Sequence, residues 1–598
     1  MVRLYIKNIV NKCKKPFTLN NNIITMANQS LIEKIRERKV GRTLAVYLGS
    51  AWVFIEAFNF LIDKYIWNAG VLNIIILLVI FGLPASVIFV WFQQKFTKRA
   101  ILLQVINGLL AISLISYNLI SPNNLNPTQL RLLKFKDNQK KLAESIRSIV
   151  ILPFANYTGD DSQDFLTFGM HDALISELGQ LGAIRVVSTT TALSYSDTEM
   201  TIQEIASELK VDAIIEASML SVEENIRIQL KLINAFPDEQ QLWSQTFNSD
   251  MSNILDLYNR VIKNIASEIQ ITLTSGQEVQ LEEVRQVNPE AYKAYLRGMY
   301  NLNQLTPETT KRGLEYLHEA VRLDPADPFA YAGLALGYLE VAHGPLDPGD
   351  ALEKAEAAAI QAFMIDTTLA ETYSAMAEIY LYSTWQFDKV EEYFKRALAI
   401  NPNLDLAHYH YAWALYLFGR MDEAIVEHKL AQKYDPLNPL HTAWLGGLYT
   451  YAGRHEEAIE EALKSFEIQK DYPAGYFVMG EANLAMGREE EAIEAHKKLM
   501  EVHPWWSWGL AYTYANTGHI EEAEELLSQL EDVPVNGWNA HGMMTINTAL
   551  GRIDEAFKWL NYEPHHAFCA WAAVMDEYQP LRNDPRFEDF LARLNLPE

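Results

Sequence analysis

The chain has 598 residues, of which 49% are hydrophobic, and this length exceeds what one core can organise, so several domains are expected. Residues 1–142 carry 19 Lys and Arg against 5 Asp and Glu, a net of +14, so the total of −26 leaves −40 for the remainder. This acidic body argues against nucleic acid as a partner, because phosphate contacts need clustered Lys and Arg. With only Cys13 and Cys569, a disulfide framework is excluded.

Three apolar segments follow a basic amino-terminal segment at 1–43. They lie at about 44–62, 71–92 and 100–120, and each is near the ~20 residues that a helix needs to cross a bilayer. We therefore predict three transmembrane helices. No small-residue cleavage site follows an apolar region near the amino end, so we expect no cleaved signal peptide.

The Lys and Arg residues near the ends of these segments predict their orientation. The amino end is strongly basic, the 63–70 loop contains one Lys, and the 93–99 loop contains three basic residues. This pattern places the amino end and the second loop inside, and everything after residue 120 outside. A basic cluster from Arg131 to Lys141 opposes this orientation, but it lies beyond the segment end and receives less weight.

Glu56 lies within the first apolar segment, where an ionisable side chain is costly and ordinarily marks a functional site. The alternative is a structural role, in which Glu56 hydrogen-bonds Asn59 or a neighbouring helix. The segments contain no second deep ionisable residue that could relay a proton, so the structural role is favoured.

After a linker at 121–145, the pattern changes to alternating strands and helices and predicts an α+β domain over 146–275. In the stretch NIRIQLKLI at 225–233, apolar and polar residues alternate, which is typical of a strand with one buried face. Thr201 and Glu204 predict a helix amino terminus with a capping box. We expect strands at about 148–154, 184–188, 211–220, 225–234 and 240–247, and helices at about 163–181, 201–210 and 252–272.

A fixed interval organises the rest of the chain. The dipeptides Gly419-Arg420, Gly453-Arg454 and Gly487-Arg488 are 34 residues apart, and weaker copies follow at Gly518 and Gly551. Each glycine ends one helical pattern and a second helix follows, so the unit is a helix pair that needs neighbours to bury its apolar face. We predict seven or eight units over 289–564 and capping helices over 565–598.

The unit resembles the tetratricopeptide repeat. The stretches SIVILPFANYTGDDSQDFLTFGMHDALISEL, ELKVDAIIEASM and IRIQLKLINA resemble the domain shared by the amino-terminal part of TolB and by FlgO. The whole arrangement is similar to membrane-anchored bacterial proteins, which implies an inner (cytoplasmic) membrane location, multi-pass, with periplasmic carboxy-terminal domains. Some relatives carry a winged-helix regulator or a nucleotide cyclase domain in front. We expect neither here, because the apolar segments begin by residue 44.

The sequence contains no GxxxxGK, GxSxG, HExxH or CxxC motif, so neither an enzyme nor a cofactor is predicted. His565, His566 and Cys569 form one suggestive cluster, since residues four apart on a helix can share a metal. Packing among the aromatic residues of the last repeat is the favoured explanation, because a fourth ligand has no obvious source. No metal site is therefore predicted.

A superhelix of such repeats presents a concave face built from the first helix of each unit. An aromatic, weakly charged groove suits an apolar or aromatic-bearing peptide. The alternative is that some of these rings fill the interior of the superhelix or contact the α+β domain. The predicted groove residues are Tyr382, Tyr409, Trp413, Tyr416, Tyr451, Phe477, Trp505, Trp508 and Tyr512, with Leu406 and Leu417 beside them.

These patterns together predict a multidomain chain: three transmembrane helices, a small α+β domain and an all-α tetratricopeptide-repeat superhelix. The expected function is a non-catalytic scaffold or sensor that holds a protein or peptide in the groove, with no nucleic acid partner. Two alternatives stay open. One is an enzyme related to membrane-bound adenylate cyclase systems, and the other is a signalling component that reports partner occupancy to the cytoplasm.

Overall fold

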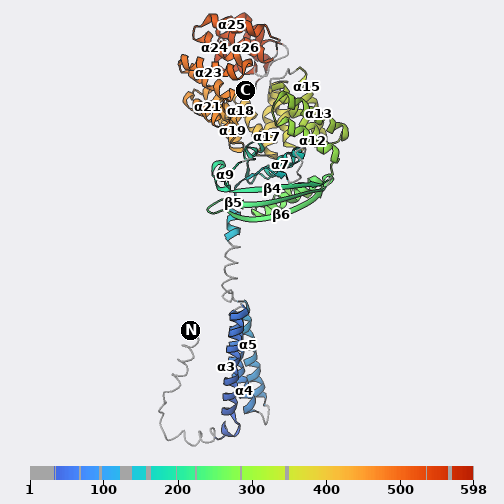
Figure 1. Ribbon diagram of the computed structural model, residues 1–598, viewed down its shortest axis with the longest axis vertical. Coiled ribbons are helices and arrows are strands. Elements are labelled where there is room, and N and C mark those ends of the chain that lie inside the picture. The colour runs from blue at the N-terminus through green and yellow to red at the C-terminus, as the bar shows by residue number, and fades with distance from the viewer. Residues whose placement is uncertain are drawn as a thin grey trace. The chain divides into compact units, whose positions relative to one another are not determined.

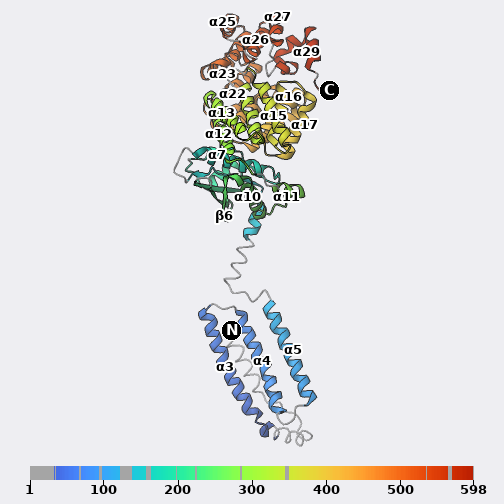
Figure 2. The same cartoon turned by 90° about the vertical axis from the view of Figure 1, so that its right-hand side faces the viewer.

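The computed structural model describes residue 33 and residues 35–65, 69–92, 97–120, 138–156, 163–196, 198–222, 225–282, 286–343, 349–533, 535, 537–562, 569–594 and 596. Most of the predicted basic segment and linker, together with His565 and His566, lie outside these residues. The chain divides into two compact units, Met1–Lys140 and Lys141–Glu598. Figures 1 and 2 show both units.

The first unit contains the helices α3 (Val40–Tyr65), α4 (Ala69–Trp91) and α5 (Lys98–Ile120). Polar side chains join them, because an unpaired polar group is costly among apolar neighbours. The Tyr47 hydroxyl of α3 donates to the carbonyl of Val79, 2.9 Å away on α4. From α5, the amides of Gln104 and Asn107 donate to carbonyls of α4 at 2.9 and 2.8 Å.

Two helices of the described chain, not three, are long and apolar enough to cross a membrane: Asn73–Trp91 and Lys98–Tyr117. The prediction of three candidate spans is therefore wrong for the first apolar segment, and membrane crossing by the second and third segments stays a prediction. The first segment does form a helix, α3, but Glu56 and Asn59 dilute its apolar sequence. Part of it, from residue 59 onward, lies where side chains are not described.

The second unit begins with a sheet and its accompanying helices, and we call this part (Ser148–Glu282) the sheet domain. The strand order is β3-β1-β4-β5-β6, with β2 also pairing with β4. Strand β1 pairs in parallel with β3 and with β4, and β2 pairs in parallel with β4. Strand β5 pairs antiparallel with both β4 and β6. The strands are β1 (Ser148–Ile151), β2 (Ala155–Asn156), β3 (Arg185–Val186), β4 (Ala213–Val222), β5 (Asn225–Asn234) and β6 (Gln240–Asp250).

Strand β5 has one buried and one wet face over residues 226–232, as its alternation predicts, whereas β1 is buried at consecutive positions. Ile226, Ile228, Leu230 and Leu232 are buried, and the residues between them are exposed or half-buried. The capping box of Thr201 and Glu204 is present at the start of α9. The accompanying helices are α7 (Asp164–Gly179), α8 (Thr189–Leu193), α9 (Ile202–Leu209), α10 (Ile254–Glu268) and α11 (Ser275–Glu282).

Eight helix pairs follow within the described residues between Pro289 and Leu560, and we call them the repeat superhelix. Gly419, Gly453 and Gly487 each separate two paired helices with φ of +70° to +74°, a conformation that only glycine adopts freely. The pairs are α12 (Pro289–Leu302) with α13 (Pro307–Leu323), α14 (Pro328–His343) with α15 (Ala351–Ile365), α16 (Ala370–Tyr382) with α17 (Phe387–Ile400), α18 (Asp405–Leu417) with α19 (Met421–Tyr434), α20 (Pro439–Tyr451) with α21 (His455–Ile468), α22 (Pro473–Ala485) with α23 (Glu489–Val502), α24 (Ser507–Asn516) with α25 (Ile520–Glu531), and α26 (Gly537–Ala549) with α27 (Ile553–Leu560).

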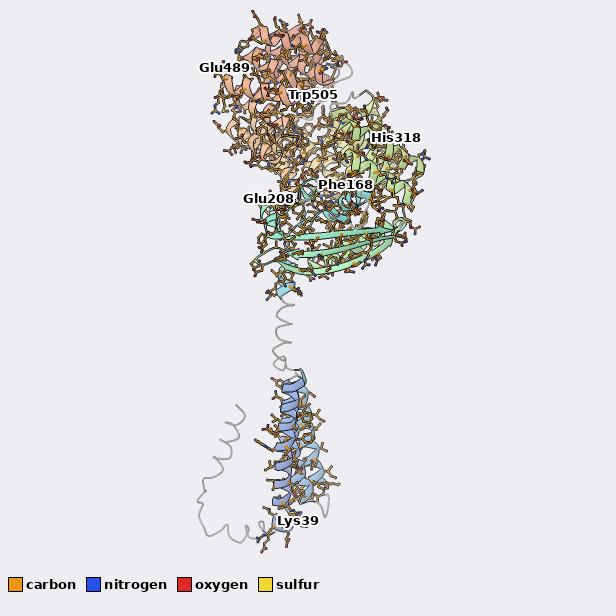
Figure 3. All side chains as sticks on the ribbon, viewed as in Figure 1. Lys39, Phe168, Glu208, His318, Glu489 and Trp505 are labelled. Carbon is orange, nitrogen blue, oxygen red and sulfur yellow. The ribbon has the colours of Figure 1, made fainter. Side chains whose placement is uncertain are left out.

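The sheet domain and the repeat superhelix form one packed body. Gly169 of α7 lies so close to Leu296 of α12 that an added Cβ would come within 2.5 Å of that side chain. Phe168, labelled in Figure 3, meets Tyr300 of α12 edge to face at 5.6 Å. The two predicted domains therefore share a continuous apolar boundary.

The last described residues form what we call the C-terminal segment (Cys569–Leu594). It contains the 3₁₀ turns η5 (Cys569–Ala573) and η6 (Asp576–Tyr578) and the helices α28 (Gln579–Arg582) and α29 (Arg586–Leu594). Trp571 of this segment stacks on Tyr382 of α16, and Phe590 of α29, a helix labelled in Figure 2, meets Trp385 just before α17. The segment therefore returns to earlier repeats and does more than cap the last helix pair.

Candidate functional site

Two turns between repeats hold the sheet domain, and we call this contact the joint. Asn403 follows α17; its Oδ1 accepts from the Val186 amide at 3.0 Å, and its Nδ2 donates to the Gly179 carbonyl at 2.8 Å. Asp435 follows α19, and its Oδ1 accepts from the hydroxyls of Ser188 and Thr191, the latter at 2.6 Å. Both turns therefore recognise the sheet domain through buried polar groups, which fixes the register of the contact.

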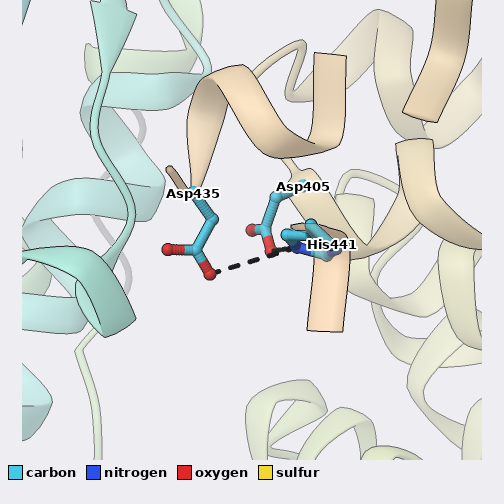
Figure 4. A group of neighbouring side chains, drawn as sticks. All are labelled: Asp405, Asp435 and His441. Carbon is cyan, nitrogen blue, oxygen red and sulfur yellow. Dashed lines mark hydrogen bonds and ion pairs between the residues drawn. The ribbon is translucent and has the colours of Figure 1, made fainter. Parts of the chain in front are cut away.

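Asp405, Asp435 and His441 come together at the joint, and their donor atoms lie within 4.8 Å of one another (Figure 4). Such a set raises the question of a metal ion. A ligating imidazole normally donates its other N–H to an acceptor. The Nδ1 of His441 is buried without a partner, so metal binding at Nε2 would strand a proton there.

A hydrogen-bonded clasp accounts for the same three residues. The His441 Nε2 lies 2.8 Å from Asp405 Oδ2 and 4.0 Å from Asp435 Oδ2, and donation to Asp405 leaves Nδ1 as an unprotonated acceptor. The other oxygen contacts of Asp435 are already made, since Asn438 Nδ2 donates to Oδ2 at 2.8 Å. Burial, and then Asp405, raise the pKa of Asp435 above its ordinary value. These three residues therefore stabilise the joint by hydrogen bonding.

The predicted groove aromatics are mostly interior. Tyr451, Trp505 and Tyr512 stay half-buried, and Trp505 is labelled in Figure 3. The alternative of packing inside the superhelix is the one the structure shows for the others, and partner binding by any of the nine stays a prediction. Six are at most 9% exposed: Tyr382, Tyr409, Trp413, Tyr416, Phe477 and Trp508.

These rings form a row across successive first helices, which we call the inner wall. Tyr416 of α18 stacks on Tyr451 of α20 with centroids 5.2 Å apart. Trp413 meets Trp444 at 5.6 Å, and Trp444 meets Phe477 of α22 at 5.7 Å. The inner wall thus runs through at least three repeats without a charged interruption among these contacts.

The C-terminal segment packs on this wall. Trp571 is fully buried and stacks on Tyr382 of α16, with centroids 5.5 Å apart and planes inclined by 24°. Tyr578 is fully buried as well, and its hydroxyl lies 2.7 Å from Thr545 Oγ1 of α26. The segment therefore bridges the third and the eighth helix pairs.

The far end of the segment makes a second bridge. Phe590 of α29 meets Trp385, the residue that precedes α17 by two positions, edge to face at 6.3 Å. Arg586 pairs with Asp554 of α27 at 2.8 Å and lies 4.4 Å above the ring of Phe557. The contacts to α16 and α17 come from residues more than 180 positions away in sequence.

Polar side chains that sequence patterns did not single out lie beside Tyr382. His410 Nδ1 is 3.2 Å from the Tyr382 hydroxyl, and its Nε2 is 3.4 Å from Glu378 Oε2. Burial raises the pKa of Glu378 to about 8 and lowers the pKa of His410 well below its usual value. Both side chains are therefore neutral near pH 7. The sequence signal for these two polar residues is their position on the first helices of the repeats. Helical periodicity alone assigns such positions to the core, so it does not single them out.

In comparison with known proteins, the sheet domain is similar to part of one family. Residues 145–265 match the HilA/YgeH-like transcriptional regulator, second domain. The likeness to the TolB and FlgO domain stays a prediction. The transcriptional regulator HilA of Salmonella typhimurium is 23% identical over 297 residues, which cover 48% of this chain and 51% of HilA. A putative adenylate cyclase 3 of Rhizobium meliloti is 25% identical over 189 residues, 32% of each chain.

The chain thus spans about half the length of one curated relative and about a third of the other. The sequence resemblance already implies that some relatives carry a regulator domain or a nucleotide cyclase domain in front of this arrangement, and the two curated relatives belong to these two classes. Among solved structures, a TPR protein of Thermus thermophilus has a TM-score of 0.27 at 19% identity, over 33% of this chain and 98% of its own. The Cut9–Hcn1 structure has a TM-score of 0.37 at 12% identity, over 96% and 99%. These scores are too low to carry an argument about function.

Proposed function

We propose that this chain is a membrane-anchored, non-catalytic interaction protein whose repeat superhelix binds a protein or peptide partner. The observation that carries the proposal is the inner wall, a row of contacting rings, together with the half-buried aromatic side chains of Tyr451, Trp505 and Tyr512. Aromatic side chains that keep one accessible edge are the residue types that most often anchor partners. Because residues 143–598 carry a net charge of −40 (−26 − 14), the partner is protein and not nucleic acid.

The membrane anchor rests on the apolar surface of the first unit. A soluble protein does not leave most of a long helix apolar and exposed, whereas a lipid bilayer covers such a surface. On α5, nine aliphatic side chains are each at least 41% exposed: Ile101, Leu102, Leu103, Val105, Ile106, Leu109, Leu110, Ile112 and Leu114.

Photo-crosslinking in cells tests the proposal. A photoreactive amino acid at Tyr512, half-buried on α24, samples the inner side of the superhelix. The same substitution at Leu463, which is 50% exposed on α21, samples a second helix and is the control. A discrete crosslinked protein from Tyr512 and not from Leu463 supports the proposal. Equal or no crosslinking from both positions contradicts it.

A regulatory role is the second candidate, and the match of residues 145–265 to the second domain of HilA-like regulators favours it. In that case, partner occupancy in the superhelix changes the activity of a cytoplasmic protein. Deleting the chain then alters transcription or cyclic nucleotide levels, whereas purified protein converts no ATP. Cyclase activity of the purified chain would instead establish the enzyme alternative.

A further inference from the structure

The C-terminal segment lies where a groove ligand would lie. A terminal cap of a repeat array covers the exposed face of the last pair only. Here Trp571 reaches Tyr382 on α16, and Phe590 reaches Trp385 before α17, five helix pairs before the last. The segment therefore occupies the inner wall in the manner of a bound peptide.

The contacts of the segment define the chemistry that the wall accepts. Trp571 and Tyr578 supply two aromatic anchors seven residues apart, and both are fully buried. Each is received by a ring or a hydroxyl: Tyr382 stacks on the first, and Thr545 hydrogen-bonds the second. Two such anchors on a short, turn-rich segment are sufficient to specify a peptide site.

One electrostatic interaction of the segment is unfavourable. Glu577 precedes Tyr578 and lies close enough to Glu481 of α22 to raise the pKa of that carboxyl, after burial itself. Glu481 Oε1 is buried and makes no hydrogen bond, and His496 Nε2 lies 3.7 Å away. Burial also raises the pKa of Glu577 to about 7. The two carboxyls therefore disfavour each other's charged form, and a basic or amide group in place of Glu577 would remove this repulsion.

We propose that the C-terminal segment is a resident, replaceable ligand of the inner wall. The partner is a peptide segment with an aromatic residue for the Trp571 position and a basic or neutral residue where Glu577 lies. It enters as the C-terminal segment leaves. This inference rests on the proposed function and names the chemistry of its partner.

A synthetic peptide of residues 569–594 with Glu577→Lys, carrying a fluorophore, is the probe. The full chain in detergent is compared with its Trp571→Ala variant, which loses the ring on Tyr382, and with Leu591→Ala, which alters an exposed side chain of the same segment. Trp571→Ala should bind the probe roughly thirty-fold more tightly than the wild type, the factor for one aromatic anchor. Leu591→Ala should match the wild type.

Two peptide controls test the chemistry. The probe with Trp571→Ala should not bind, because it lacks the first anchor. The peptide with the native Glu577 should bind more weakly than the Lys peptide, since it restores the electrostatic repulsion between two carboxyls. Equal affinity of the Lys and Glu peptides would overturn the assignment of Glu481 as the group that selects the partner.

If the Trp571→Ala chain folds but binds no probe, the proposal that the C-terminal segment is a replaceable ligand is overturned. If that variant does not fold, hydrogen exchange of the unaltered chain decides. Amides of residues 569–594 should exchange at least roughly tenfold faster than those of α18 to α21, as a locally opening unit does. Equal protection would make the segment a permanent part of the core. Crosslinks from Tyr512 would then still support the proposed function, so the two failures are distinguishable.

Discussion

Trp413 shows what the inner wall contributes to stability. Its side chain is 3% exposed and contacts the rings of Tyr416 and Trp444. Trp413→Ala should lower the free energy of unfolding by about 3–5 kcal/mol, the usual cost of emptying a large aromatic site. Urea denaturation measures the change, with Val426→Ala, an exposed apolar position on α19, as the control. A loss no larger than that of the control would show that the ring lies on the surface.

Glu378 makes stability depend on pH. Its pKa is raised from 4.5 to about 8 by burial, so the folded chain keeps a proton that the unfolded chain loses. The contribution of Glu378 to the free energy of unfolding is fully present below pH 4.5. It is lost as the pH rises to about 8, at roughly 1.4 kcal/mol per pH unit within that window. Glu378→Gln should flatten this decline.

Urea denaturation at pH 5 and pH 8 measures the effect of Glu378→Gln. The neighbours of the carboxyl, Ser374 and His410, stay in place, and the amide keeps its shape. Glu489→Gln on the exposed start of α23 is the matched control and should leave the decline as it is in the wild type. An unchanged pH dependence in Glu378→Gln would mean that the carboxyl ionises inside the folded chain.

At the scale of the element, the turn after α19 determines whether the sheet domain stays on the superhelix. Asp435→Ala would leave the buried hydroxyl of Thr191 and the Asn438 amide without their acceptor. We expect a loss of about 2–5 kcal/mol, since each stranded buried polar group costs about 1–3 kcal/mol. The sheet domain should then melt before the repeats, as followed by proteolysis. Asp422→Ala, exposed on the same helix pair, is the control. A single unshifted transition would refute the role of the joint.

The elements themselves follow from sequence to a large extent. Gly419, Gly453 and Gly487 mark the helix pairs because a positive φ needs glycine, and the alternation in β5 marks its buried face. The exposure of the groove aromatics cannot be predicted from the sequence, because periodicity specifies which face of a helix a residue lies on and not what else packs against that face. Trp571 packs on Tyr382 across 189 positions (571 − 382), and no local signal encodes such a contact.

At the scale of the whole molecule, the anchor sets which side of a membrane receives the superhelix. Three basic residues lie between the predicted second and third spans, which predicts that this loop is inside and that a reporter fused after residue 280 is periplasmic. A fusion after residue 96 should be cytoplasmic. A cytoplasmic signal after residue 280 would instead give priority to the basic cluster from Arg131 to Lys141.

The return of the C-terminal segment to α16 and α17 also bears on how such a chain can change in evolution. An open solenoid gains or loses a unit at little cost, because each unit meets only its neighbours. Here the segment that follows the eighth pair must reach Tyr382 and Trp385 in the third. Inserting or removing one 34-residue unit between them would shift the ends of this bridge by a full repeat and separate Trp571 from Tyr382. Repeat number in this protein is therefore a fixed dimension, as strand number is in a closed barrel.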